Sequence, residues 1–123
     1  MTPFAGTRVL VVEDEGAIAL LIEDMLEEFG CRVVASVARL APACEMARTV
    51  MVDLAILDVN LAGERVFPVA DILRSRHIPF LFSTGYGASG VPPEYAGCPV
   101  LHKPYSEREL QQTIAVALAG GSR

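Results

Sequence analysis

The sequence predicts an α/β fold, with one doubly wound sheet of five parallel strands and helices on both faces. Short apolar runs rich in branched side chains alternate along the chain with segments whose apolar residues recur at helical spacing. The connections between them are short, as in doubly wound sheets. Right-handed crossovers leave few topologies, and the flavodoxin-like order 2-1-3-4-5 is the usual one for five strands.

The first half of the chain supplies two strands and two helices of this pattern. A β-branched run at Arg8–Val12 predicts the first buried strand, and three acids follow it. From Ala17 a helix is expected to end at Gly30. A second strand is expected at 31–35, and an Ala-rich helix from about Leu40 to Val50. The residues expected on the buried face of the first helix are Ile18, Leu21, Ile22, Met25 and Leu26.

The second half continues the alternation. The apolar run at 54–61 predicts a buried third strand that ends at Asp58, and Gly63 opens a loop into a helix with Pro68 near its beginning. A fourth strand is expected at 79–84. Two glycines and three prolines in 88–99 mean that any helix there is short or irregular. A brief fifth strand at 100–102 precedes a last helix, which a capping box at 106–109 begins and Gly120 ends.

Composition sets limits on the class of protein. With 123 residues, 52% hydrophobic and 20% charged, the chain has the size and composition of one globular domain, with a core at about 8–118. The net charge of -5 and the absence of a Lys/Arg run argue against direct nucleic-acid binding. The apolar runs are too short to span a membrane, and three widely spaced cysteines suit a reducing compartment. We therefore expect a cytoplasmic protein.

Three carboxylates are predicted to meet at one edge of the sheet. In the order 2-1-3-4-5 the first and third strands are neighbours, so Glu13, Asp14 and Asp58 lie at adjacent carboxyl ends. Carboxylates this close repel one another unless a cation lies among them. Mg²⁺ prefers oxygen ligands, and the backbone carbonyl of Asn60 can add another. The sequence therefore predicts a magnesium site.

The fourth and fifth strands add a hydroxyl and an ammonium group to the same edge. Thr84 and Lys103 stand at their ends, where they can hold the oxygens of a phosphoryl group. Beside a metal-bound carboxylate, this set indicates nucleophilic chemistry by Asp58 with a mixed anhydride as the product. No histidine, serine or further carboxylate is placed as an obvious general base.

Four motifs in this order resemble those of the response-regulator receiver domains of bacterial two-component signalling, and the resemblance extends from about residue 8 to residue 118. The motifs are Val11-Val12-Glu13-Asp14-Glu15, Ile56-Leu57-Asp58-Val59-Asn60-Leu61, Ser83-Thr84-Gly85 and Leu101-His102-Lys103-Pro104. Each is weak alone, but all four fall at predicted strand ends. The chain is thus similar to the CheY-like receiver family.

The resemblance implies a role for each site residue. Asp58 matches the phosphoacceptor, Asp14 a direct Mg²⁺ ligand and Glu13 its acidic companion. Asn60 matches the position whose carbonyl binds the metal, Thr84 the switch hydroxyl and Lys103 the cation that pairs with the phosphoryl group. The family also implies a cis Lys103-Pro104 peptide.

The resemblance further implies partners and a type of activity. A histidine kinase or phosphotransfer protein would supply the phosphoryl group, and a downstream protein would read the changed face formed by the fourth helical segment, the fifth strand and the last helix. The chain would be no enzyme acting on a separate substrate, since it would catalyse only its own phosphorylation and slow dephosphorylation.

One position departs from the common family pattern. Many receivers carry Tyr or Phe three residues before the lysine, where this chain has Val100. Phe82-Ser83-Thr84-Gly85-Tyr86 resembles a receiver subgroup with a Phe-Ala-Thr-Gly motif that also lacks this aromatic residue. We hypothesise that Tyr86 and the Gly/Pro-rich segment after it take over part of the switch.

Other functions stay open at this stage. A phosphorylation-independent binding module with the same fold would be marked by loss of Asp58, Asp14 or Lys103, and all three are present. A phosphatase or phosphotransferase with an aspartyl intermediate would need an acid/base near the nucleophile. The chain is also consistent with a receiver fragment of a hybrid histidine kinase.

Overall fold

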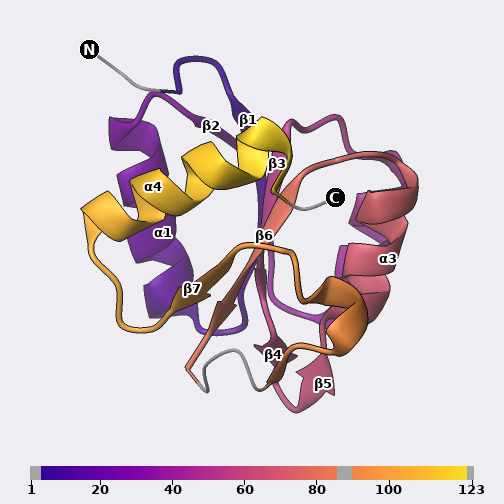
Figure 1. Cartoon of the computed structure of the whole chain (residues 1–123). Helices are drawn as coiled ribbons and strands as arrows, with labels where there is room; N and C mark the ends of the chain where they lie inside the picture. Colours follow the sequence, from indigo (N-terminus) through magenta and orange to yellow (C-terminus); the bar gives the residue numbers. More distant parts are fainter. Residues whose placement is uncertain (1–3, 86–89, 122–123) are drawn as a thin grey trace.

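One five-stranded parallel sheet forms the centre of the molecule (Figure 1). The computed structural model describes residues 4–85 and 90–121. The sheet has the order β2-β1-β3-β6-β7, and these are its second, first, third, fourth and fifth strands along the chain, so the predicted order 2-1-3-4-5 is confirmed. The strands are β1 (Arg8–Val12), β2 (Arg32–Val37), β3 (Leu54–Asp58), β6 (Phe80–Thr84) and β7 (Val100–His102).

Helices cover both faces of this sheet (Figure 1). α1 (Gly16–Glu28) and α4 (Glu107–Val116) pack on one face, and α2 (Leu40–Thr49) and α3 (Phe67–Ser75) pack on the other. Successive strand residues point to opposite faces, so β1 sends Val9 and Val11 to one core and Leu10 and Val12 to the other. All five residues of β3 are buried, as expected for a central parallel strand.

A small hairpin follows β3, where the sequence predicted only a loop. β4 (Asn60–Leu61) pairs antiparallel with β5 (Glu64–Arg65). The two turn residues, Ala62 and Gly63, have φ angles of 52° and 93°, and both therefore adopt the left-handed conformation of a tight hairpin turn. Glycine adopts this conformation without strain, whereas Ala62 does so at a cost.

The crossover from β6 to β7 contains the short 3₁₀ turn η2 (Pro93–Tyr95). This agrees with the prediction that any helix in 88–99 is short. Tyr95 is completely buried and stacks on Phe67, 5.6 Å between ring centroids, and it meets Phe80 and Phe82 edge-on. Its hydroxyl donates to the carboxylate of Asp71 in α3. The crossover is therefore anchored to α3 by an aromatic core.

The structure contradicts one sequence prediction in α1 and confirms another at the start of α4. Leu21 was expected in the core, but it is 58% exposed, and this prediction is wrong because α1 buries the narrower stripe of Ala19, Ile22 and Leu26. The capping box of Ser106 and Glu109 is present at the start of α4.

After α4 the chain makes one wider turn, η3 (Ala117–Gly121), whose Gly120 has a φ of 98°. No helix in the described parts of the chain is long and apolar enough to cross a membrane.

Candidate functional site

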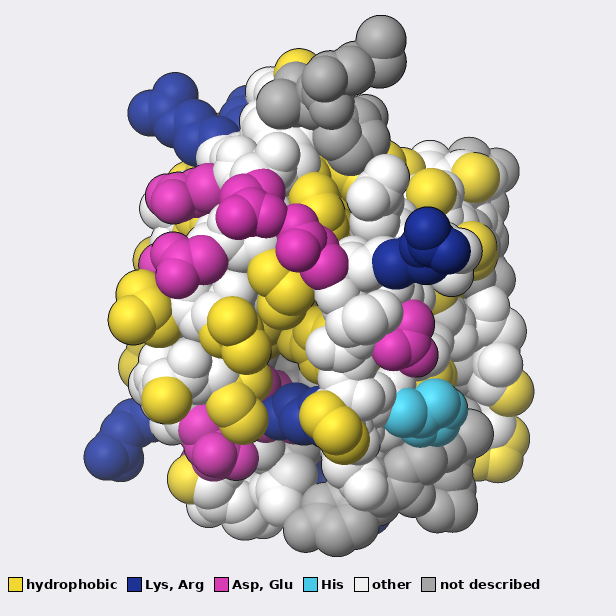
Figure 2. Space-filling view, turned by 90° about the vertical axis from the view of Figure 1, so that its left-hand side faces the viewer, with side chains coloured by type: hydrophobic (Ala, Val, Ile, Leu, Met, Phe, Trp, Pro, Cys, Tyr) yellow, Lys and Arg dark blue, Asp and Glu magenta, His cyan; other side chains and the backbone are white. Residues whose placement is uncertain are grey.

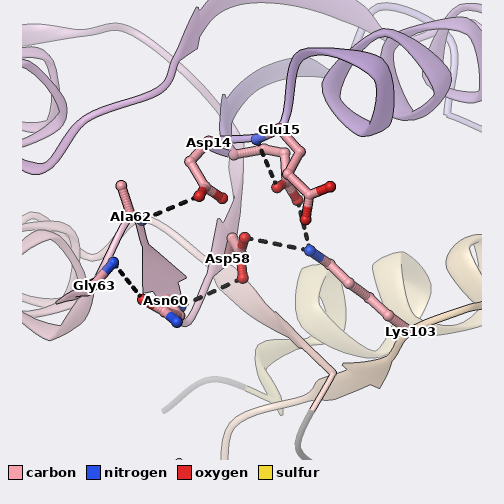
Figure 3. Close-up of polar contacts among 8 residues, drawn as sticks. Asp14, Glu15, Asp58, Asn60, Ala62, Gly63 and Lys103 are labelled. Carbon is pink, nitrogen blue, oxygen red and sulfur yellow. Dashed lines mark hydrogen bonds and ion pairs between the residues drawn. The ribbon is translucent and has the colours of Figure 1, made fainter.

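The register of two central strands brings the predicted carboxylates together. β1 and β3 are parallel neighbours, and Val12 pairs with Leu57, so the next residues, Glu13 and Asp58, lie side by side. Asp14 follows from the same end of β1. One carboxylate oxygen from each of Glu13, Asp14 and Asp58 lies within 4.8 Å of the other two, and Figure 3 shows Asp14 and Asp58 facing the same space. The structure therefore confirms the convergence expected from the strand order.

Lys103 supplies the cation of the cluster. It follows β7, and its Nζ lies 3.0 Å from Glu13 Oε1 and 3.2 Å from Asp58 Oδ2. Burial opposes the charged form, but hydrogen bonding to Glu13 and the attraction of both carboxylates outweigh it and raise the pKa of Lys103. The ammonium group therefore stays protonated between these two acids.

The acidity of Asp58 is strongly perturbed by its surroundings. It is 6% exposed, and burial, together with the hydrogen bond and negative charge of Glu13, raises its pKa to about 7 even though Lys103 opposes the change. Burial also acts against ionisation of Asp14, but hydrogen bonds from Asp58 and from the Ala62 amide outweigh it and lower the pKa of Asp14. Negative charge in the cluster is therefore only partly neutralised by Lys103.

The acids open into a small pocket of about 160 Å³ at the carboxyl edge of the sheet. Its walls include Asp58, Asn60, Thr84 and Lys103, four residues that the sequence predicted for the site, together with Asp14, Glu15 and Gly85. Thr84 is 1% exposed at the end of β6, and its backbone carbonyl accepts the Lys103 amide at 2.9 Å. A phosphoryl group can enter this pocket beside Asp58.

The hairpin after β3 contributes backbone groups that sequence reasoning missed. The Ala62 amide donates to Asp14 Oδ2 at 3.1 Å, and the Gly63 amide donates to Asn60 Oδ1 at 2.8 Å (Figure 3). The Asn60 amide points to Asp58 Oδ1 at 3.4 Å. The sequence indicated a turn at Gly63. That the preceding Ala62 amide donates to Asp14 depends on how the chain folds, so the sequence did not predict it.

The composition of the cluster suits a hard divalent cation. Three carboxylates within 4.8 Å of one another offer oxygen ligands, which Mg²⁺ prefers. Burial and the neighbouring Glu13 raise the pKa of Asp58 to about 7, so its ionised form is disfavoured without further positive charge. A divalent cation bound by these oxygens would favour full ionisation of the carboxyl groups.

Comparison with known proteins gives the chain its family. A family model described as the response regulator receiver domain matches residues 9–115. The chain belongs to the response regulator receiver domain family. The match includes every motif residue of the acidic pocket.

Solved structures agree with this assignment. SdrG of Sphingomonas melonis is 40% identical, with a TM-score of 0.83 over 93% of this receiver domain and 97% of SdrG. The response regulator PhyR of Brucella abortus is 28% identical, with a TM-score of 0.82 over 96% of this chain, which covers half of PhyR. The receiver domain of the sensor histidine kinase PA1611 of Pseudomonas aeruginosa, solved with a magnesium ion in its active-site cleft, is 26% identical, with a TM-score of 0.79 over 94% of this chain and 100% of that one. Among curated protein sequences, none matches significantly.

The structure describes one feature that the resemblance implied and one position at which this receiver domain departs from the common pattern. The Lys103-Pro104 peptide is cis, as the resemblance implied. Val100 is half-buried and packs against the core that contains Tyr95. The hypothesis about Tyr86 concerns a residue outside the described part of the chain.

An apolar groove of about 330 Å³ adjoins the acidic pocket of the receiver domain. The segment after β7 lines it with Lys103, Pro104 and Tyr105, and α1 lines it with Ile18, Leu21, Ile22 and Met25. Figure 2 shows this face, with hydrophobic side chains around a cationic group and carboxylates above them. Leu20 and Leu21 are 60% and 58% exposed, so α1 presents a sizeable apolar surface beside the site.

Proposed function

We propose that this receiver domain accepts a phosphoryl group on Asp58 and passes the signal on through a changed protein-interaction surface. The observation that carries the proposal is the position of the Asp58 carboxylate, 3.2 Å from Lys103 Nζ and grouped with Glu13 and Asp14 at the edge of an open pocket. A buried carboxylate held between a cation and two acids has the surroundings of a nucleophile that receives an anionic group.

In the proposed reaction a carboxylate oxygen of Asp58 attacks phosphorus, and the bond from phosphorus to the donor breaks. The product is a mixed anhydride on Asp58. Lys103 stays protonated and offers its ammonium group to a phosphoryl oxygen, and Thr84 offers its hydroxyl from the end of β6. Mg²⁺, when bound by Glu13, Asp14, Asp58 and the Asn60 carbonyl, would supply the positive charge that ionises Asp58 and balances the phosphoryl oxygens.

We assign the donor to the class of histidine kinases and phosphotransfer proteins, which carry phosphohistidine. The groove beside Lys103 supports this, because its apolar walls suit a helix that presents a phosphorylated side chain to the pocket. Carboxylates lie above the hydrophobic side chains on this face (Figure 2). At the end of α1, Glu28 raises the pKa of Glu107, the first residue of α4, by hydrogen bonding. A donor with basic residues at this end of its helix fits best.

In this proposal the chain is not an enzyme that acts on a separate substrate. It catalyses its own phosphorylation and slow dephosphorylation, and a downstream protein reads the result.

Phosphate transfer from a small donor tests the proposal directly. The protein is incubated with acetyl phosphate and Mg²⁺, and its intact mass is measured. We expect one added phosphoryl group on the wild type and none on Asp58→Asn. Asp53→Asn is the matched control, since Asp53 lies just before the opposite end of β3 and pairs with Arg8. Equal addition to wild type and Asp58→Asn, or none to either, contradicts the proposal.

A further inference from the structure

The β4–β5 hairpin is in contact with two parts of the molecule that are far apart in the sequence. Its tip reaches the acidic pocket, where the Ala62 amide donates to Asp14 Oδ2 at 3.1 Å. Its base reaches the β6–β7 crossover, where Arg65 Nη1 donates to the Gly90 carbonyl at 3.2 Å. Figure 1 shows the hairpin between the end of β3 and the orange crossover segment. The hairpin therefore bridges a proposed metal ligand and the crossover.

The contact at the tip orients Asp14 without using up its capacity to bind a cation. A carboxylate oxygen has two lone pairs, so Oδ2 can accept the amide and still offer electrons to a metal. Groups that hydrogen-bond to a metal ligand fix its orientation and strengthen binding. Ala62 holds its left-handed φ of 52° in this contact, which is costly for a residue with a side chain. The turn therefore depends on surroundings that include Asp14.

The contact at the base joins the hairpin to a segment that is otherwise anchored away from it. In the crossover, Tyr95 is fixed by the aromatic core and by Asp71, on the side of α3. The Gly90 end meets the hairpin instead: a Cβ placed on Gly90 would lie 3.6 Å from the Arg65 guanidinium and 3.9 Å from Val59. Arg65 thus holds the beginning of the described crossover against the hairpin.

The position of Val100 gives this bridge a role. Val100, three residues before Lys103, is aliphatic and half-buried. It therefore offers no aromatic ring that could rotate when the pocket is filled. We infer that the β4–β5 hairpin, through the Ala62 amide and Arg65, couples cation binding at Asp14 to the local stability of the crossover from Gly90 to Pro99. This inference rests on the proposed function, since it concerns the regulation of the same site.

Thermodynamic linkage makes the coupling testable from either end. If Mg²⁺ stabilises the hairpin and the hairpin stabilises the crossover, then releasing the crossover must weaken Mg²⁺ binding by the same factor. Simple electrostatics predicts the opposite sign, because removing the positive charge of Arg65 makes the surroundings more favourable for a cation. Arg65→Ala therefore separates the two explanations.

The experiment measures Mg²⁺ affinity by calorimetry and amide hydrogen exchange in unphosphorylated protein. For Arg65→Ala we expect affinity to fall by about two- to fivefold, the range of one hydrogen bond at a partly exposed site. We also expect Mg²⁺ to slow exchange of the Tyr95, Ala96 and Cys98 amides, which all bond within the crossover, in the wild type but not in this variant. Arg65→Lys, which keeps the charge and a donor, should restore part of both effects.

Arg108→Ala is the matched control, because it removes one exposed arginine from α4 and should leave both readouts unchanged. Unchanged or tighter Mg²⁺ binding by Arg65→Ala overturns the inference, as does Mg²⁺ protection of the crossover that persists in this variant or is absent from the wild type. Neither readout involves phosphate transfer. If Asp58 is phosphorylated but Arg65→Ala behaves as wild type, only the coupling fails; if coupling is seen without phosphorylation, only the proposed function fails.

Discussion

Replacing Asp58 by asparagine should stabilise the protein in the absence of divalent cations. The pKa of this carboxyl is raised from 3.8 to about 7, so its ionised form is disfavoured in the folded state. At about 1.36 kcal/mol for each pH unit, ionisation costs up to ~4 kcal/mol of folding free energy. The carboxyl borders an open pocket, and solvent screening should reduce the cost to about 2 kcal/mol. Asparagine removes this cost, while Lys103 keeps Glu13 as a partner.

The sign of the pH dependence follows from the same pKa. Between pH 3.8 and about 7 the folded protein holds a proton on Asp58 that the unfolded chain has released. Stability of the wild type contributed by this group is therefore lost as pH rises through that window. The difference between Asp58→Asn and wild type should be small near pH 4 and reach about 2 kcal/mol at pH 8.

Urea unfolding of both proteins in EDTA, at pH 5, 6.5 and 8, measures this difference. Asp53→Asn provides a control of opposite sign, because hydrogen bonding to Arg8 lowers the pKa of Asp53 and makes its ionised form stabilising. That contribution is present above the unfolded-state pKa and is lost as pH falls through the folded one. Destabilisation by Asp58→Asn at pH 8, or a difference that does not change with pH, would refute the reasoning.

Three further predictions concern other parts of the chain. Lys103→Ala should slow phosphorylation by acetyl phosphate by about 100-fold, because the half-buried cation between Glu13 and Asp58 is lost; a rate within a few-fold of wild type in a mass-based time course would argue against its role. Tyr95→Phe should cost about 1 kcal/mol through the lost bond to Asp71, and Tyr95→Ala about 3–5 kcal/mol through the cavity in the aromatic core; equal urea midpoints for the two variants would show that the ring is not a core residue. Ser106→Ala should cost about 1 kcal/mol by removing the cap of α4 and leave phosphorylation unchanged, whereas a matching loss of phosphorylation would mean that α4 takes part in it.

The sheet and the acidic cluster were predictable from the sequence because both follow from strand order. Buried parallel strands leave continuous apolar runs, and one topology accounts for five of them with short connections. Once β1 and β3 are neighbours, Glu13 and Asp58 must meet. Lys103 follows β7, an edge strand two positions from β3, and therefore lies at the same carboxyl edge of the sheet. The positions at which the strands end were enough to predict that these side chains meet.

The features that were missed depend on contacts between segments. Strands of two residues leave no periodic pattern, so the pairing of Asn60 with Arg65 appears only in the structure. Leu21 has helical spacing like its neighbours, but the width of the stripe that α1 buries is set by the sheet beneath it. The burial of Tyr95 likewise depends on Phe67 and Phe80, which come from other elements.

The position of the phosphoryl group is the measurement closest to the central claim. The protein is phosphorylated with acetyl phosphate and Mg²⁺ and then treated with borohydride, which reduces an acyl phosphate on aspartate to homoserine. Peptide mass spectrometry then locates the reduced residue. We predict homoserine at position 58 and at no other aspartate. Homoserine at Asp14 or elsewhere, or unmodified Asp58 in protein whose mass shows an added phosphoryl group, would contradict the account.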